Sequence, residues 1–294
     1  MNNSPSKHKI IVRSEFENAE MRGSDVGEIE LPLSIWEKLR NTTAVRRMSI
    51  LVVLAAIWQV YAVWLNNPLM FPQFTEMSAA FWDASVNGEM LIMAWRSVEL
   101  LLIGYSIGVV IAGVLTTLAV STRIGTDLLA TLTTGFSPLP AIALLPLALL
   151  WFGLGAGSII FVLVHSVLWP LALSTHSGFL AVSDTLRMAG HNFGLSGYRY
   201  VCRILIPAAF PSILSGLKIG WAFAWRTLIA AELVFGAASA GGGLGWFIFE
   251  NRMELETPYV FAGLTAVIII GLFVEAVIFR TIEIHTVRKW GMLR

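Results

Sequence analysis

The stretch that decides the fold is residues 128–183, LLATLTTGFSPLPAIALLPLALLWFGLGAGSIIFVLVHSVLWPLALSTHSGFLAVS. These 56 consecutive residues include no Asp, Glu, Lys or Arg. Because roughly 20 apolar residues span a lipid bilayer, the stretch is long enough to cross a membrane twice. Residues 152–157, FGLGAG, are the expected break between the two crossings.

The composition of the whole chain agrees with a membrane protein. Hydrophobic residues make up 56% of the 294 residues and charged residues 13%, and the mean hydropathy is +0.73. An ordinary soluble domain has about 25% charged residues. The composition therefore excludes a soluble enzyme, a disordered chain and a nucleic-acid binder. A single cysteine, Cys202, excludes an internal disulfide framework and a cysteine-based zinc site.

Apolar runs on both sides of the central stretch bring the number of expected spans to six. They are residues 48–65, 97–120, 128–150, 158–180, 208–235 and 259–282. Backbone polar groups must be paired inside the hydrocarbon, and runs of this length are too long for barrel strands. The sequence therefore predicts an all-α membrane protein with six transmembrane helices. Prolines are expected to kink or interrupt the third span, at Pro138, Pro140 and Pro146.

Charge divides the chain into three parts and sets its orientation. Residues 1–47 form a charged tail, residues 48–282 the six-helix domain, and residues 283–294 a second tail. With the N-terminus inside, the inside segments hold 15 Lys and Arg and the outside segments one. Because cytoplasmic loops are enriched in Lys and Arg, both termini are predicted to be cytoplasmic.

The predicted cytoplasmic loop between the fourth and fifth spans, residues 183–206, is long for a membrane hairpin. A short helix that ends at a glycine, a second amphipathic segment and a proline at the start of the next span would form a rigid corner at the membrane surface. The alternative is an ordinary interfacial helix. The residues that mark the pattern are Met188, Ala189, Gly190, Gly194, Ile204 and Pro207.

This loop resembles the coupling loop of bacterial ABC-importer permeases, in which Glu-Ala-Ala, three residues and Gly are followed nine residues later by Ile-x-Leu-Pro. The spacing from Gly194 to Pro207 matches, and Ile206 replaces Leu. The first three residues depart, because Met188 stands where the acid usually is and only Ala189 agrees.

Further segments resemble the nitrate, sulfonate and taurine branch of these permeases, and the resemblance runs from about Trp58 to Phe279. They are SPLP at 137–140, LP at 145–146 and LWFGLG at 150–155, then AW at 224–225, AAEL at 230–233 and GLG at 243–245. The resemblance implies the type I importer permease fold in the bacterial cytoplasmic (inner) membrane. It also implies a second permease copy, usually an identical one, two ATPase subunits and a periplasmic solute-binding protein.

The chain itself shows no nucleotide or metal site. No phosphate-binding loop is present, so ATP and Mg²⁺ are expected on the ATPase subunits. His165 and His176 share a helix face but lie about 16 Å apart along it, too far for one metal ion. In the coupling loop, the apolar residues expected to enter a groove on the ATPase are Phe193, Leu195 and Tyr198, with Arg187 and Arg199 beside them.

Ionisable residues inside the spans are candidates for the solute pathway, because burying them is costly. Arg226, near the middle of the fifth span, is expected to line the path of an anion such as nitrate, a sulfonate, taurine or a related organic acid. The alternative is a buried ion pair with Glu232 or Glu99. Further pathway candidates are Glu232, His165 and Trp225. His165 and His176 have the alternative of hydrogen bonds between helices, and Lys218 is expected to contact Trp221 by a cation–π interaction.

Two other classes of protein remain as alternatives. A secondary transporter working without ATP would show inverted or parallel repeats and broken, acid-rich helices at matching positions. An intramembrane enzyme would need a nucleophile with a base, or a metal cluster, within the spans. Neither pattern is found, and the function predicted from the sequence is a permease subunit that is not itself an enzyme.

Overall fold

The computed structural model describes residues 43–120, 122–235 and 241–289, and every regular element in these ranges is helical. The elements in chain order are α2 (Thr43–Leu65), α3 (Phe74–Val86), α4 (Glu89–Val120), α5 (Arg123–Phe136), η2 (Ala141–Leu144), α6 (Leu145–Phe152), α7 (Ala156–Leu180), α8 (Asp184–Asn192), α9 (Gly197–Tyr200), η3 (Val201–Leu205), α10 (Ile206–Phe235), α11 (Leu244–Met253), α12 (Thr257–Phe273), η5 (Val274–Phe279), α13 (Arg280–Glu283) and η6 (Ile284–Arg288).

The chain divides into two units, Met1–Ala56 and Ile57–Arg294, and each is described by itself. In the first unit the structure describes the first turns of α2, whose apolar side chains are exposed, among them Leu51 and Val52. A helix that is apolar on every side is typical of a lipid-facing span. The second unit, here called the body, holds all the other helices.

Five helices in the described residues are long and apolar enough to cross a membrane, and a bent pair makes a sixth span if it is counted as one. The all-α fold predicted from the sequence is confirmed. The helices are longer than the predicted runs: the first begins at Thr43 rather than at residue 48. The last runs from Thr257 to Arg288, past the predicted end at 282, through π-helical turns at η5 and η6.

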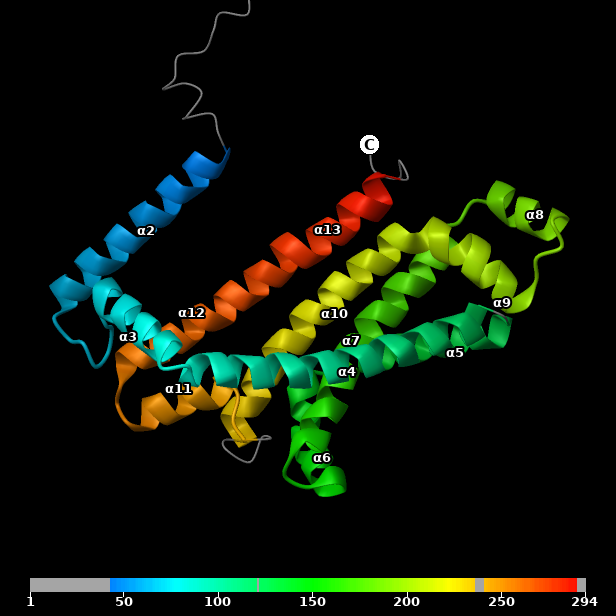
Figure 1. The fold of residues 1–294 in the computed structure, drawn as a ribbon. Helices are drawn as coiled ribbons and strands as arrows, with labels where there is room; N and C mark the ends of the chain where they lie inside the picture. Colours follow the sequence, from blue (N-terminus) through cyan, green and yellow to red (C-terminus); the bar gives the residue numbers. More distant parts are fainter. Residues whose placement is uncertain (1–42, 121, 236–240, 290–294) are drawn as a thin grey trace, which may run out of the picture. The chain divides into compact units, whose positions relative to one another are not determined.

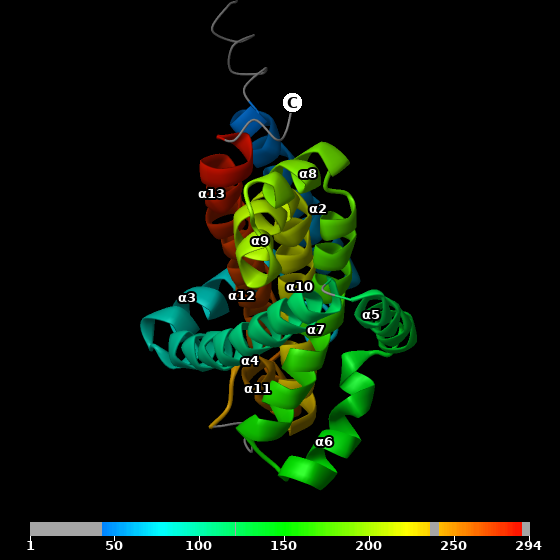
Figure 2. The ribbon, with the colours of Figure 1, turned by 90° about the vertical axis from the view of Figure 1, so that its right-hand side faces the viewer.

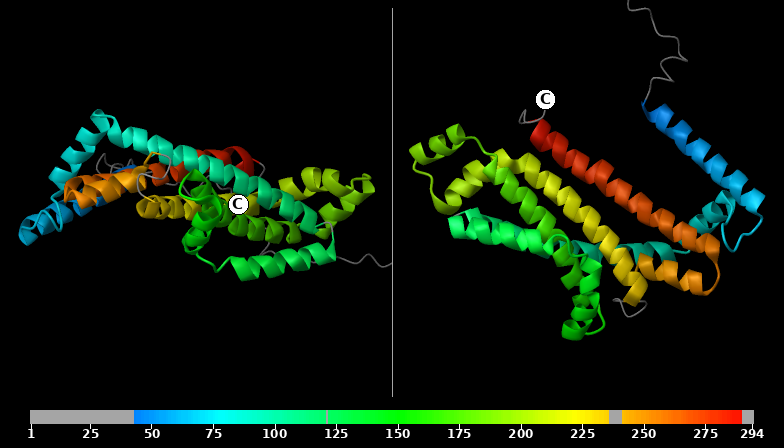
Figure 3. Two further views of the ribbon diagram at one scale, coloured as in Figure 1. Left: turned by 90° about the horizontal axis from the view of Figure 1, so that it is seen from below. Right: turned by 180° about the vertical axis from the view of Figure 1, so that it is seen from behind.

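The third predicted span, 128–150, is not one straight helix. The helices Arg123–Phe136 and Ala141–Phe152 meet at an angle of 87° (Figure 3). Pro138 and Pro140 stand in the break and supply no N–H, so the backbone hydrogen bonds of α5 cannot continue through them. The second expected break, at 152–157, is confirmed, since Gly153 ends α6 with φ +71° and α7 starts at Ala156.

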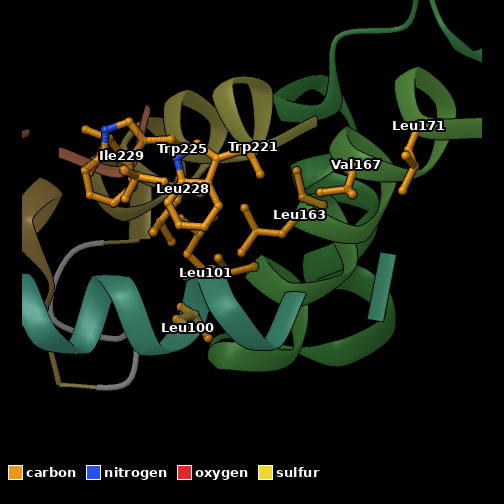
Figure 4. Packing of buried hydrophobic residues seen from close by; sticks show 14 of the residues in the cluster. Leu100, Leu101, Leu163, Val167, Leu171, Trp221, Trp225, Leu228 and Ile229 are labelled. Atoms are coloured by element: carbon orange, nitrogen blue, oxygen red, sulfur yellow. The ribbon is translucent and has the colours of Figure 1, made fainter. Parts of the chain in front are cut away.

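The core of the body lies where α4, α7 and α10 cross (Figure 4). Leu101 from α4, Leu163 and Val167 from α7, and Leu228 from α10 are all completely buried there. Trp221 and Trp225 of α10 pack at the edge of the same cluster. Without a strong hydrophobic drive in lipid, close packing of this kind holds membrane helices together.

Small residues set how closely these helices approach. A Cβ atom at Gly104 would lie 2.7 Å from the Cβ of Leu163, and one at Gly108 would lie 2.8 Å from the Cβ of Val167. The α4–α7 crossing therefore requires glycine at both positions, as the small-residue pattern of the second span suggests. Gly113 of the same helix has open space around it and is not needed for this crossing.

The body carries different small helices at its two ends. Helices α8, α9 and α13 lie at one end of the long helices, while α6 and α11 lie at the other (Figures 1 and 2). Helix α3 packs against α12, and the hydroxyl of Tyr259 in α12 donates to the Asp83 carboxylate of α3 at 2.8 Å. An amphipathic helix within residues 68–88 is also what the apolar spacing of that segment indicates.

Candidate functional site

Helix α8 ends as its sequence predicts. Gly194 has φ +71°, a value that favours glycine because a side chain there would be strained. The Gly194 N–H donates to the carbonyl of His191 at 2.9 Å, and the Leu195 N–H donates to the carbonyl of Gly190 at 3.0 Å. These two bonds close the end of the helix and turn the chain toward α9.

Helix α8 is fixed in place by contacts at both of its ends. The Arg187 guanidinium donates to the carbonyls of Phe179 at 2.6 Å and Val182 at 3.1 Å, at the end of α7. Arg187 therefore anchors α8 to the membrane helix, and its place beside a partner contact stays a prediction. At the other end of α8, Gly190 packs against the ring of Tyr200, and a Cβ atom at Gly190 would lie 3.0 Å from that ring.

Pro207 lies near the start of α10 but inside a longer helix, and its role at the entry of the fifth span stays a prediction. Residues Gly197–Phe235 form one continuous helix of 39 residues, with a π-helical segment, η3, just before Pro207. Proline lacks an N–H, and its ring would collide with the carbonyl of Arg203 in a regular α-helix. The wider turns of η3 accommodate that ring without ending the helix.

Apolar side chains are exposed on the corner formed by α8 and α9. Phe193 is 84% exposed, Tyr198 70% and Met188 59%. The other residues of the pattern are less accessible: Gly190 is buried, and Ala189, Leu195 and Ile204 are half-buried. They therefore pack within the corner rather than on its surface. Exposed aromatic residues gathered on a rigid projection are typical of a protein interaction surface. The corner surface is defined here as Met188, Phe193 and Tyr198.

A cavity of about 340 Å³ lies in the membrane part of the body, between the α5–α6 break, α7 and α10. Arg226 and His165, both predicted pathway residues, line this cavity. Its other lining residues include Ser137, Pro138, Pro140 and Ile142 from the break, Ser166, Trp169 and Pro170 from α7, and Phe223, Thr227 and Ala230 from α10.

Some polar groups that line the cavity are hydrogen-bonded and others are not. The Ser166 and Thr227 hydroxyls are hydrogen-bonded at 3.0 Å. Neither ring nitrogen of His165 has a hydrogen-bond partner among the described residues, and nor does Nε1 of Trp169. His165 therefore does not make the hydrogen bond between helices considered as its alternative role. Buried His176 likewise has an unpartnered Nε2 within the described part of the chain, and it does not line the cavity.

Arg226 is exposed, and within residues 43–120, 122–235 and 241–289 no carboxylate lies within ion-pair distance of it. Its guanidinium stands 6.0 Å from the centre of the Phe223 ring. The predicted alternative, a pair with Glu232 or Glu99, is not formed. Arg226 also borders a second groove, on the α12 side of α10, which Trp225 lines.

Glu232 and Trp225 do not line the cavity, although both were expected in the pathway. The Trp225 indole donates to the carbonyl of Val267 in α12 at 3.2 Å. Lys218 pairs with Glu283 at 2.7 Å instead of making the expected cation–π contact with Trp221. These three residues fasten α10 to its neighbours.

Glu232 is 2% exposed and joins α10 to α4 and α11. The Ser97 hydroxyl of α4 donates to its carboxylate at 2.7 Å, and the Gly245 N–H of α11 donates at 2.8 Å. The Leu244 N–H donates to the Ser97 oxygen at 2.9 Å. A carboxylate at a helix N-terminus is stabilised by the unpaired N–H groups and by the helix dipole. These residues are called the Glu232 junction below.

The junction explains two glycines that a sequence pattern alone leaves unexplained. A Cβ at Gly243 would overlap the Glu232 carboxylate and the Ser97 hydroxyl, and one at Gly245 would lie 2.6 Å from Cβ of Glu232. The GLG pattern at 243–245 therefore leaves room for the carboxylate. The carbonyl of Gly241 also accepts a hydrogen bond from the Arg96 guanidinium, which ties this glycine to α4.

Several residues of these sites could not be singled out from the sequence. Ser97 lies 135 residues from Glu232 and carries no local pattern. Trp169 could have been found with His165, because residues four positions apart on α7 lie on the same face of the helix. Ser166 and Thr227 directly follow His165 and Arg226, but adjacent residues of a helix point in different directions, so no spacing pattern marks them.

Comparison with known proteins agrees with this architecture. Residues 68–281 match the family described as binding-protein-dependent transport system inner membrane component. The chain is 30% identical over 226 residues to the putative aliphatic sulfonates transport permease protein SsuC of Escherichia coli, covering 75% of this chain and 82% of SsuC. It is 27% identical over 251 residues to the nitrate import permease protein NrtB of Synechocystis, covering 83% of this chain and 89% of NrtB.

A third relative has a higher identity over a shorter part of the chain. The taurine transport system permease protein TauC of Escherichia coli is 34% identical over 140 residues, 48% of this chain and 50% of TauC. All three relatives are transport permease subunits rather than enzymes. With the helical architecture and the family match over most of its length, the chain belongs to the binding-protein-dependent transport system inner membrane component family, as an ABC transporter permease of the sulfonate, taurine and nitrate branch.

Proposed function

We propose that this permease is the membrane subunit of an ATP-driven importer. Two copies would form one translocation path, and an ATPase subunit would dock on the α8–α9 corner of each copy. ATP and Mg²⁺ would be held by the ATPase subunits, and a periplasmic binding protein would deliver the solute. In this arrangement both termini of the chain, and the corner, lie on the cytoplasmic side of the inner membrane.

The corner surface is the observation that carries this proposal. Met188, Phe193 and Tyr198 present apolar side chains on a projection that is anchored to α7 by Arg187 and is continuous with α10. A short helix that seats apolar residues in a groove is a common way for one protein to bind another. Because the corner is rigid, movement of a bound ATPase would pass into the membrane helices.

The mechanism that this arrangement supports is alternating access. Closure of the ATPase dimer on ATP would close the cytoplasmic side of the permease and open the periplasmic side, where the binding protein releases its solute. The glycine-mediated contacts of α4 with α7 at Gly104 and Gly108 are tight enough for these helices to move together.

We propose a small anion as the solute. Relatives are named for sulfonates, taurine and nitrate. Arg226 places a positive charge on the membrane cavity with no carboxylate paired to it in the described residues. An ionisable residue inside a membrane protein is costly and usually serves the transported ion or solute.

The test replaces Gly194 by valine. A residue other than glycine at φ +71° costs about 1–2 kcal/mol, and a β-branched one is especially unfavourable, so the end of α8 should be displaced. We expect Gly194→Val to enter the membrane but to lose co-elution with the ATPase subunits in detergent, or to lose solute-stimulated ATP hydrolysis. Phe193→Ala should weaken co-elution without any strain, because that side chain is 84% exposed.

The matched control is Gly88→Val. Gly88 also has positive φ, +79°, and also has no atom near its missing Cβ, but it lies between α3 and α4 rather than at the corner. It should co-elute as the unmodified chain does. Normal co-elution and normal stimulation for both Gly194→Val and Phe193→Ala would show that the corner is only a connector. Solute uptake without any ATPase would favour a secondary transporter instead.

A further inference from the structure

The membrane cavity combines one positive group with walls made of flat rings. The Trp169 indole is stacked on Phe136, with ring centres 5.1 Å apart and an angle of 8° between the planes. His165 meets Trp169 edge-on at 6.1 Å. Pro138 and Pro140 also line the cavity, where the helix is interrupted. These rings leave the guanidinium of Arg226 as the one fully charged group among the cavity residues described.

Several hydrogen-bond donors in this cavity lack an acceptor. Trp169 is only 8% exposed, yet its indole N–H has no partner among the residues of the described ranges. An indole N–H can only donate, and a neutral imidazole donates through one of its ring nitrogens. Arg226 adds a fork of N–H groups that matches the oxygens of a carboxylate or sulfonate. The buried indole N–H and imidazole call for a hydrogen-bond acceptor, and the exposed guanidinium of Arg226 favours one that carries negative charge.

The size of the cavity and its ring walls argue against an inorganic anion as the whole ligand. About 340 Å³ lies at the small end of the range, about 300–1,000 Å³, in which proteins hold organic molecules. An inorganic oxyanion has only a handful of atoms and would leave the Trp169 and proline walls without contact. An aromatic ring packs well against another aromatic ring such as the Trp169 indole, edge-on or with offset faces.

We propose that this cavity is a binding site for an aromatic carboxylate or sulfonate, with the acid group at Arg226 and the ring between Trp169 and the prolines of the α5–α6 break. The inference rests on the proposed function, because it names the class of solute that the permease passes. It places a selective site in the permease itself, in addition to the selection made by any binding protein.

The test uses four probes on the full chain in nanodiscs of phosphatidylcholine, with binding measured by isothermal titration calorimetry. Benzenesulfonate carries both the ring and the charge, methanesulfonate the charge alone, benzyl alcohol the ring alone, and nitrate is the inorganic anion. We expect benzenesulfonate to bind at least about tenfold more tightly than each of the other three, since only it makes both kinds of contact.

Two variants and their controls locate the binding. Arg226→Gln should weaken benzenesulfonate binding by about tenfold or more, the order expected when a hydrogen bond to a charged group is lost. Trp169→Phe removes the indole N–H and keeps a ring, so it should weaken binding by a smaller factor. The controls are Arg252→Gln and Trp95→Phe, which change exposed residues away from the cavity and should bind as the unmodified chain does.

Each remaining outcome would overturn the proposal. Equal binding of nitrate or methanesulfonate would make this a site for small anions, and equal binding of benzyl alcohol would make it an apolar pocket. Loss of benzenesulfonate binding when phosphatidylglycerol is added to the nanodisc would reassign the site to an anionic lipid headgroup. No binding of any probe to the unmodified chain would remove the site. Co-elution with the ATPase involves no probe, so it would still decide the proposed function separately.

Discussion

The Glu232 junction makes a prediction that separates a structural role for this carboxylate from a role in the solute pathway. Glu232→Ala would remove the acceptor of two hydrogen bonds, one from the Ser97 hydroxyl and one from the Gly245 N–H. The Gly245 N–H would then be buried at the start of α11 without a partner. The change would also take away the negative charge that the N-terminus of α11 favours.

The expected loss of stability follows from these contacts. Each hydrogen bond to a charged group contributes about 1.5–3 kcal/mol to the free energy of unfolding. The substitution also removes the cost of burying a carboxylate, and this offsets part of the loss. We therefore expect Glu232→Ala to destabilise the body by about 3 kcal/mol. For a protein of this size that corresponds to a fall in melting temperature of roughly 6–12 °C. Glu232→Gln keeps the shape and one acceptor oxygen, and should cost about 1 kcal/mol.

The assay is thermal unfolding of the purified permease in nanodiscs, followed by loss of the monodisperse peak in size-exclusion chromatography. Glu99→Ala is the matched control, because Glu99 is an exposed carboxylate on α4, two residues from Ser97. Gly243→Ala should resemble Glu232→Ala, since the new methyl group would occupy the place of the carboxylate. A Glu232→Ala protein as stable as the unmodified chain but inactive in uptake would refute the structural reading and return Glu232 to the pathway.

Two further predictions concern transport and orientation. Arg226→Gln should reduce solute uptake in proteoliposomes while leaving the basal ATPase activity of the assembled complex intact, whereas Arg252→Gln should change neither; failure of the Arg226→Gln complex to assemble would point to an ion pair with another subunit. In a chain with Cys202→Ser, a cysteine at Asn87 should react with a membrane-impermeant thiol reagent in intact cells and one at Ser183 should not, and the reverse labelling pattern would place the α8–α9 corner outside the cell.

Features that depend on local chemistry could be predicted from the sequence. Each long helix could be located from an apolar run in the sequence. The bilayer sets the length of such a helix and requires its backbone hydrogen bonds to form within it. Gly194 could be assigned to the end of α8, because only a glycine readily adopts the positive φ that closes a helix there. The break around Pro138 and Pro140 could be anticipated as well, although its 87° angle depends on packing that no local pattern records.

Features that depend on distant partners could not be predicted. Lys218 meets Glu283 across 65 residues, and Glu232 meets Ser97 across 135. A carboxylate in the middle of an apolar helix looks the same in sequence whether it faces a solute path or the end of another helix. The helix that continues through Pro207 could not be predicted for a different reason, because proline is as compatible with a widened turn inside a helix as with the first turn of a new one.

The continuity of α9, η3 and α10 has a mechanical consequence. Tyr198 of the corner surface and Arg226 of the cavity stand on the same helix, about 40 Å apart along its axis. In the proposed importer, this helix would connect the ATPase contact at one end with the solute site at the other. Helices at interfaces between subunits commonly move by about 1–2 Å when a protein switches conformation. A shift applied at Tyr198 reaches Arg226 to the extent that the two weak points between them, the π-helical η3 and Pro211 inside α10, do not absorb it. In the proposed importer, the stiffness of Val201–Leu205 and of the turn at Pro211 would therefore set how closely ATP hydrolysis is coupled to movement at the cavity.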